Sequence, residues 1–254
     1  MSHTDDFQHP NQPARLLVGC AGWTIPGADR DAFPSEGSHL EKFARVLSAV
    51  EINSSFYRPH RPETYARWAD CVPAQFRFSV KLPRSITHDA KLRDIAEPLR
   101  DFASQAGALG SKLGCVLVQL PPKLGFDPEL AGEFFARLKE TFSCTIACEA
   151  RHPEWFADGA SELLERQGIT RVIADPPKGQ DGPHRPTTDT IYVRLHGAPR
   201  IYYSSYGDDY LDELACNMLE HARAGRTVWT IFDNTASGAS VPNALRVQGV
   251  IAKA

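Results

Sequence analysis

The 254-residue sequence lacks several features that would assign it quickly to a class of protein. It has no C-x-x-C pair to suggest a metal or redox site. No G-x-G-x-x-G motif follows the first apolar segment, so a dinucleotide-binding fold loses its main support. No stretch approaches the roughly 18 apolar residues of a membrane helix. A formal net charge of −3 gives no broad basic field for nucleic acid, although a local basic patch stays open.

The cysteines and the amino-terminal segment indicate an intracellular chain. Most of the six cysteines fall inside apolar strand or helix patterns, so we interpret them as small buried side chains in a reduced compartment. Residues 1–14 are polar and lack the apolar core of a signal peptide, and we expect a disordered leader there. Residues 15–254 are expected to form one domain of a cytoplasmic protein that does not enter the membrane.

Strand-like and helix-like segments alternate along the chain. Strands are predicted at residues 15–22, 49–56, 76–82, 114–120, 145–151, 171–175, 190–197 and 227–234. Helices are predicted at 40–47, 63–72, 97–109, 128–142, 159–167, 210–224 and from 240, the first with a capping box of Ser38 and Glu41. Residues 176–189 hold four prolines and two glycines, so we expect a loop there. Eight such units predict a single α/β domain, a (β/α)₈ barrel of the TIM type that is irregular after its sixth strand.

Strand alternation gives several predicted strands a polar face inside this barrel. Because successive side chains point to opposite faces, the apolar partners go to the helix layer and the polar residues go inward. The inward residues near carboxyl-terminal strand ends include Glu51, Lys81, Glu149, Arg194 and His196. Barrel enzymes place their catalytic groups at that end. The alternative is a set of ion pairs that only maintain the fold, but desolvating so many ions on one rim is costly.

Several motifs, taken in order, resemble the YecE-like family, a barrel family called a domain of unknown function. They are Gly19–Trp23, Val50–Tyr57, Phe78–Lys81 with Thr87 and His88, Val118–Pro122, Glu149 and Arg151 with Trp155, Tyr192–Gly197, and Phe232–Thr235. The first loop, residues 24–38, departs from the pattern of many relatives and keeps only Phe33 and Pro34. The resemblance implies the barrel and the rim, but no particular activity.

Six residues are candidate catalytic groups: Glu51, Lys81, Glu149, Asp175, His196 and Asp233. Glu51 is the first candidate for a general acid or base, since a recessed carboxyl group has a pKa that burial raises and cations lower. His196 is the natural proton shuttle, with a buried structural histidine as the alternative. Lys81 would form a Schiff base if its pKa were depressed, but an ion pair with carboxylates opposite is the favoured interpretation.

The candidate substrate-binding residues combine cations, amides and aromatic rings around the same rim. Arg151 and Arg194 offer bidentate forks for a carboxylate or phosphate. The remaining candidates are Trp23, Asn53, Tyr57, His88, Gln119, Trp155, Tyr192, Tyr203, Tyr206 and Asn234. The aromatic members would stack against sugars or bases, and ordinary loop packing is their alternative.

The sequence favours a metal-independent enzyme that uses acid–base chemistry on a small polar or anionic substrate. No cofactor and no metal ligand are predicted, because the positive charges of Lys81, Arg151 and Arg194 would repel a divalent cation. A metal-assisted hydrolase or isomerase is the second hypothesis. A non-catalytic module for an anion or a nucleic-acid end is the third. The residues do not separate hydrolase, lyase and isomerase, and they do not indicate an oligomeric state.

Overall fold

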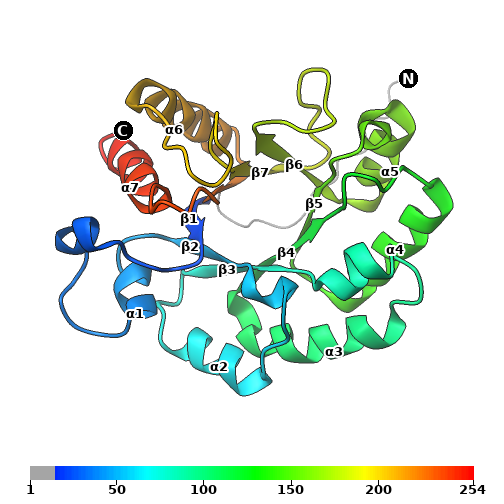
Figure 1. Cartoon of the computed structure of the whole chain (residues 1–254), viewed down its shortest axis with the longest axis horizontal. Helices are drawn as coiled ribbons and strands as arrows, with labels where there is room; N and C mark the ends of the chain where they lie inside the picture. Colours follow the sequence, from blue (N-terminus) through cyan, green and yellow to red (C-terminus); the bar gives the residue numbers. More distant parts are fainter. Residues whose placement is uncertain (1–14) are drawn as a thin grey trace.

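A computed structural model describes residues 15–254, so the leader predicted at residues 1–14 lies outside the described residues. Eight parallel strands follow one another around a closed barrel, and β1 pairs with β8. The strands are β1 Leu16–Ala21, β2 Ala49–Ile52, β3 Arg77–Lys81, β4 Leu113–Gln119, β5 Thr145–Glu149, β6 Thr170–Asp175, β7 Thr190–Leu195 and β8 Thr227–Phe232. Figure 1 shows the helices as an outer ring around these strands, which confirms the predicted barrel.

An α-helix follows every strand except β6, as the sequence predicts. The helices are α1 His39–Ala44, α2 Pro62–Asp70, α3 Ala96–Ala106, α4 Pro128–Thr141, α5 Asp158–Gln167, α6 Asp208–Arg223 and α7 Ser240–Ile251. The capping box is present, because the Glu41 amide donates to the Ser38 hydroxyl and the Ser38 amide donates to the Glu41 carboxylate. The β6–β7 connection runs as a loop without a helix (Figure 1).

The second strand is shorter than predicted. It ends at Ile52, and Ser54–Phe56 form a 3₁₀ turn, η2. The Ser55 hydroxyl lies 2.9 Å from the Ile52 carbonyl and 2.7 Å from the Lys81 carbonyl, and it donates to both. This side chain therefore turns the backbone at the end of β2 and ties the turn to β3.

The apolar core has two parts, one inside the barrel and one between the strands and the helix ring. The inner part contains Leu117, Tyr192 and Trp229, and the rings of Tyr192 and Trp229 stack with centroids 5.8 Å apart. Gly114 lies against this stack: a Cβ there would come within 2.7 Å of the Trp229 ring. The lower barrel is thus closed by aromatic side chains, and polar groups gather above them.

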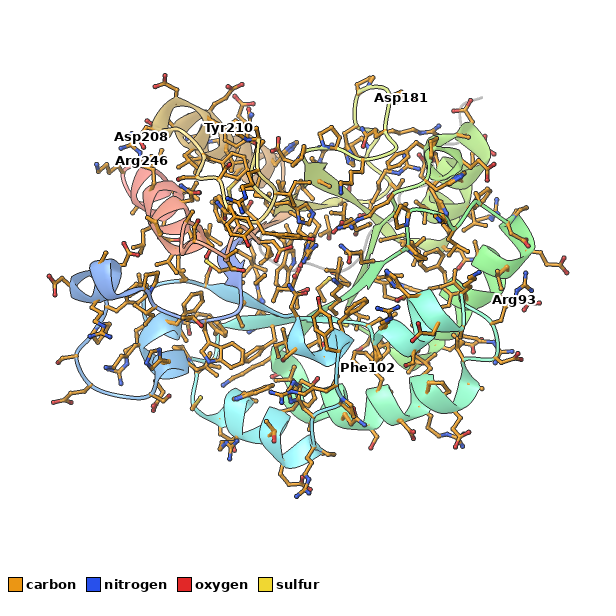
Figure 2. The ribbon with its side chains drawn as sticks, in the orientation of Figure 1. Arg93, Phe102, Asp181, Asp208, Tyr210 and Arg246 are labelled. Atoms are coloured by element: carbon orange, nitrogen blue, oxygen red, sulfur yellow. The ribbon has the colours of Figure 1, made fainter. Side chains whose placement is uncertain are left out.

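Ion pairs on the outer surface connect α6 and α7. Arg246 of α7 forms ion pairs with Asp208 and Asp212 of α6 at 3.3 and 2.6 Å, and Figure 2 shows Asp208 beside Arg246.

All six cysteines are free, but Cys216 is exposed on α6, so the prediction of burial is wrong for this residue. In the chain from residue 15 onward, no helix is both long enough and apolar enough to cross a bilayer.

Candidate active site

Three carboxylates surround one buried guanidinium, that of Arg194, near the carboxyl-terminal ends of the strands. Its Nη2 lies 2.7 Å from Oε1 of Glu51 and 3.0 Å from Oδ2 of Asp233. Its Nη1 lies 2.8 Å from Oε2 of Glu149. Burial by itself lowers the pKa of Arg194, but the charges of these carboxylates outweigh burial and raise it. Arg194 is therefore a fixed cation that holds residues from β2, β5 and the end of β8 together.

Glu51 lies deeper than the rim position that the sequence predicts. It has no exposed surface, and both of its oxygens are fully used. Oε1 accepts from Nε and Nη2 of Arg194 at 3.1 and 2.7 Å. Oε2 accepts from Nε of Arg194 at 3.0 Å and from the Tyr192 hydroxyl at 2.9 Å. Glu51 and Tyr192 therefore position Arg194 from below, which differs from the acid–base and substrate-binding roles expected of them.

His196 stands between two carboxylates of this cluster. Its Nδ1 lies 3.0 Å from Oδ2 of Asp233, and its Nε2 lies 3.3 Å from Oε1 of Glu149 without a well-directed hydrogen bond. Burial lowers the pKa of His196, but the hydrogen bond with Asp233 and the close approach and charge of Glu149 outweigh it, so the pKa is raised. The ring of Tyr202 covers the imidazole edge-on, with centroids 5.8 Å apart.

Several side chains hold the carboxylate of Glu149 in place at the rim. Its Oε1 accepts from Gln119 at 2.9 Å and from Nε and Nη2 of Arg151 at 3.0 and 2.8 Å. Burial raises the pKa of Glu149, but Arg194, His196 and Arg151 hold it well below its usual range. The opposite side has a similar arrangement, where Asn53 donates to Oδ1 of Asp233 at 3.2 Å. The predicted binding residues Gln119, Asn53 and Arg151 therefore all orient carboxylates.

Lys81 enters the rim from the end of β3 and is 6% exposed. Its Nζ lies 4.3 Å from the centroid of the Phe56 ring. Within residues 15–254 this ammonium forms no hydrogen bond and no ion pair within 4.0 Å, so the expected ion pair is absent. Burial, and then the charge of Arg194, lower the pKa of Lys81 to about 8, although Glu51, Glu149 and Asp233 oppose this shift.

His88 lies beside Lys81 on the same aromatic ring. Its ring meets Phe56 edge-on at 5.0 Å, and its Nδ1 is 2.9 Å from the Thr87 hydroxyl. Burial and the charges of Lys81, Arg84 and Arg151 lower the pKa of His88. This sector of the rim is therefore dominated by cations, while His88 itself is uncharged at neutral pH.

Asp175 is not part of the cluster. It follows Ala174 on β6, whose interior face carries Val172, so alternation turns Asp175 toward the helix side. Its oxygens accept from the hydroxyls of Tyr206 at 2.8 Å and Tyr210 at 3.2 Å. Figure 2 shows Tyr210 near the start of α6. The structure thus separates Asp175 and Tyr206 from the other predicted site residues.

Trp155 and Asn234 also lie away from the interior of the rim. Trp155 is 1% exposed, packs against Phe126 and donates from Nε1 to the Leu124 carbonyl at 3.0 Å. Asn234 is fully buried and donates to the Ser204 carbonyl at 3.0 Å. Motif matches pointed to both residues, but the structure uses them to position the loops after β4 and β7.

Three predicted rim aromatics lie at separate places around the mouth. Trp23 packs edge-on against Trp68 at 5.0 Å. Tyr57 is 79% exposed, and Tyr203 lies under the guanidinium of Arg200 at 3.9 Å. They do not form one stacking platform.

Sequence reasoning missed Phe56 and gave no separate role to Tyr202. Phe56 was assigned to an extended strand, and only the η2 turn carries its ring beneath Lys81. Tyr202 has a φ of 70°, and its amide donates to the His196 carbonyl. The run of three tyrosines within residues 202–206 was the available signal, but it did not show which ring meets the histidine.

No cluster of three His, Cys, Asp or Glu side chains suited to a metal ion occurs in the part of the chain that the structure describes. The rim carboxylates that could serve as metal ligands are engaged by protein cations. Arg194 contacts Glu51, Glu149 and Asp233 at 2.7, 2.8 and 3.0 Å. The donor set therefore does not fit a divalent cation.

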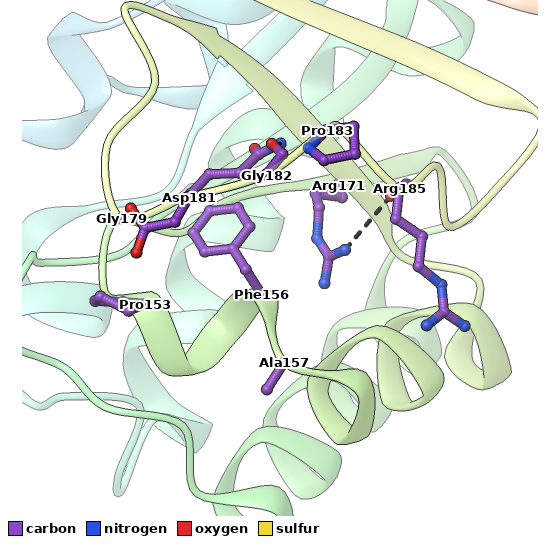
Figure 3. Close-up of a pocket in the computed structure, with 10 residues that line it drawn as sticks. Pro153, Phe156, Ala157, Arg171, Gly179, Asp181, Gly182, Pro183 and Arg185 are labelled. Carbon is purple, nitrogen blue, oxygen red and sulfur yellow. Dashed lines mark hydrogen bonds between the residues drawn. The ribbon is translucent and has the colours of Figure 1, made fainter.

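A cavity of about 340 Å³ opens beside the rim, between the η5 turn Pro153–Phe156 and the β6–β7 loop. Figure 3 shows Phe156, Arg171 and Arg185 on its walls. Arg171 donates to the Trp155 carbonyl and the Ser161 hydroxyl at 2.9 Å, and Arg185 pairs with Glu165. Both arginines are occupied, so we assign no ligand to this cavity.

Comparison with known proteins gives matches along almost the whole described chain. Residues 17–254 match the family model "Protein of unknown function DUF72". The chain is 30% identical to UPF0759 protein YecE of Escherichia coli over 174 residues, which cover 63% of this chain and 59% of the relative. It is 23% identical to UPF0759 protein YunF of Bacillus subtilis over 90% of this chain and 92% of that protein. A DUF72 family structure from Thermotoga maritima aligns with a TM-score of 0.76 and 25% identity, covering 94% of this chain and 99% of that one.

Proposed function

We propose an activity from the residues of the rim, because the chain belongs to the DUF72 family and that family is described only as being of unknown function. The family membership agrees with the YecE-like motifs of the sequence. The protein is an enzyme that uses metal-independent acid–base catalysis on a small anionic substrate at the carboxyl-terminal rim. The observation that carries this proposal is the imidazole of His196, held 3.0 Å from Asp233 and 3.3 Å from Glu149.

His196 is the proton donor in this scheme. Its raised pKa lets the imidazole keep its proton to a higher pH than an unperturbed histidine does. Asp233 fixes the ring through Nδ1, and Nε2 has no well-directed protein acceptor. Nε2 is itself buried, so a substrate atom would reach it only after a neighbouring side chain moves aside. That atom would receive the Nε2 proton, and the imidazole would take it back later in the cycle.

The charges around this histidine favour an anionic substrate. The carboxylates of Glu51, Glu149 and Asp233 face the cations of Arg194 and Arg151 and, below its pKa of about 8, the ammonium of Lys81. Protonation of His196 then leaves a net positive charge at the mouth. Arg151 uses Nε and Nη2 on Glu149, which leaves Nη1 to meet a carboxylate or phosphate oxygen.

The test is a combined binding and turnover screen with a panel of small carboxylates and phosphate esters. Saturable binding with product formation is expected in the wild type, and chelator treatment is expected to leave turnover unchanged. H196N should lower kcat by about 10²–10⁴-fold and leave binding within a few fold. H39N, a change on the exposed start of α1, is the matched control and should have no effect.

Two outcomes contradict the proposal. Saturable binding without turnover of any panel member would assign the protein to a non-catalytic anion-binding role. Turnover that disappears with chelator and returns with a divalent metal would favour metal-assisted chemistry instead.

A further inference from the structure

The ammonium of Lys81 differs from that of an ordinary structural lysine. In the same barrel, Nζ of Lys112 donates to two backbone carbonyls, those of Ala69 and Val72. Lys81 is more deeply buried and has no such acceptor within residues 15–254; its neighbour is the face of Phe56 at 4.3 Å. A buried charge without hydrogen-bond acceptors is costly, so the neutral amine forms at a lower pH here, about 8, than in an exposed lysine.

The position of Lys81 would let a neutral amine react with a bound substrate. Lys81 ends β3 at the rim, where barrel enzymes hold their reacting groups. The charges of Glu51, Glu149 and Asp233 reach this side chain and raise its pKa. The face of Phe56 attracts the ammonium form, but it does not engage the nitrogen lone pair of the neutral form. Lysines activated in this way by desolvation act as nucleophiles toward carbonyl carbon.

We propose that Lys81 forms an imine with a small anionic aldehyde or ketone bound at the rim. This inference rests on the proposed function, because it uses the same anion-binding mouth and the same proton donor. The substrate class is a carbonyl compound that carries a carboxylate or a phosphate.

The step balances without any oxidant or reductant. The lone pair of Nζ attacks the carbonyl carbon, and a C–N bond forms as the C=O π electrons move to oxygen. That oxygen takes a proton, which we assign to the His196 imidazolium of the same rim, and a carbinolamine results. The neutral imidazole of His196 takes one proton from the nitrogen and returns it to the hydroxyl oxygen, and the C–O bond breaks as that oxygen leaves as water. The products are an iminium ion and one molecule of water.

Reductive trapping tests the proposal on the full chain. The protein is incubated at pH 8 with pyruvate, glyoxylate or dihydroxyacetone phosphate and cyanoborohydride, and its intact mass is then measured. We expect one adduct per chain to form rapidly, and peptide mapping should place it on Lys81. The rate should rise with pH through about 8, where the amine becomes neutral.

Two variants provide the controls. K81R keeps the charge but cannot form an imine, and K81M removes the charge, so agreement between them excludes a folding artefact; circular dichroism confirms that both fold. K123R, a change at an exposed lysine, should trap as the wild type does. An adduct that forms at the same rate in K81R, or a wild-type rate no higher than that of K81R, would overturn the proposal.

The same experiment separates this inference from the proposed function. If the three probes bind and H196N still lowers turnover, but no Lys81 adduct forms, the imine is wrong and the acid–base site stands. If neither these probes nor the wider panel of anions binds, both proposals fail.

Discussion

Arg194 and Glu51 form a two-pronged ion pair inside the barrel, with Nη2 2.7 Å from Oε1 and Nε 3.0 Å from Oε2. Their side chains are 1% and 0% exposed. Deletion of either partner leaves a buried charge without its counter-ion.

R194M should therefore be strongly destabilising. Loss of the guanidinium leaves Glu51 without a counter-ion, while Glu149 and Asp233 keep only Arg151 and His196. Breaking a buried pair costs about 3–5 kcal/mol of the free energy of unfolding. Urea denaturation at pH 7 measures this change. R246M breaks an exposed arginine–carboxylate pair between α6 and α7 and is the matched control, for which a far smaller change is expected. Equal losses in the two variants would contradict the structural role of Arg194.

The titration of His196 should depend on Asp233. In the wild type, we expect its imidazole to titrate above 6.5, and D233N should lower its pKa. A raised pKa means that His196 contributes stability below pH 6.5, and this contribution is lost as pH rises through the folded-state pKa. NMR titration of the imidazole protons, assigned with H196N, measures the shift. His221, whose pKa burial lowers, should titrate below 6.5 in both proteins.

Y192F should weaken the support beneath Arg194. The variant keeps the ring stacked on Trp229 but removes the hydroxyl that donates to Oε2 of Glu51 at 2.9 Å. Oε2 then keeps only the Nε donor of Arg194, and the loss of a buried hydrogen bond to a charged acceptor costs about 1–3 kcal/mol, measured by urea denaturation. Y203F, at a half-exposed tyrosine of the β7–α6 loop, should not change stability. A loss below about 0.5 kcal/mol for Y192F would show that the hydroxyl is not needed.

G114A should disturb the floor of the barrel. The added methyl group would lie 2.7 Å from Cζ2 of Trp229, and overpacking of this kind costs about 1–3 kcal/mol. Thermal unfolding and the fluorescence of Trp229 report the change. G159A adds the same methyl group in α5, where no atom lies within 4 Å, and should not destabilise the protein. Equal stability of G114A and the wild type would mean that Trp229 moves freely.

The sequence predicted the barrel because strand length, helix spacing and the proline-rich gap after β6 are local signals. Alternation also identified Glu149, Arg194 and His196 correctly as interior side chains. It could not predict depth, because the height of a residue in a barrel depends on how neighbouring strands are staggered. Glu51 therefore lies below Arg194 instead of beside it. Alternation also fails where a strand ends, as at Phe56, because the direction of a turn depends on contacts such as the hydroxyl of Ser55.

The β6–β7 loop packs against the backbone of Arg151, so changes in this loop can alter the ligand preference of the fold. Gly179 lies so close to the backbone of Arg151 that a Cβ would come within 2.6 Å of the Arg151 carbonyl oxygen. A longer loop or a bulkier residue there would shift Arg151, while β2 and β7 would still hold Glu51 and Arg194. We therefore expect relatives to gain new specificity through this helix-free connection, with the charge cluster beneath it kept intact.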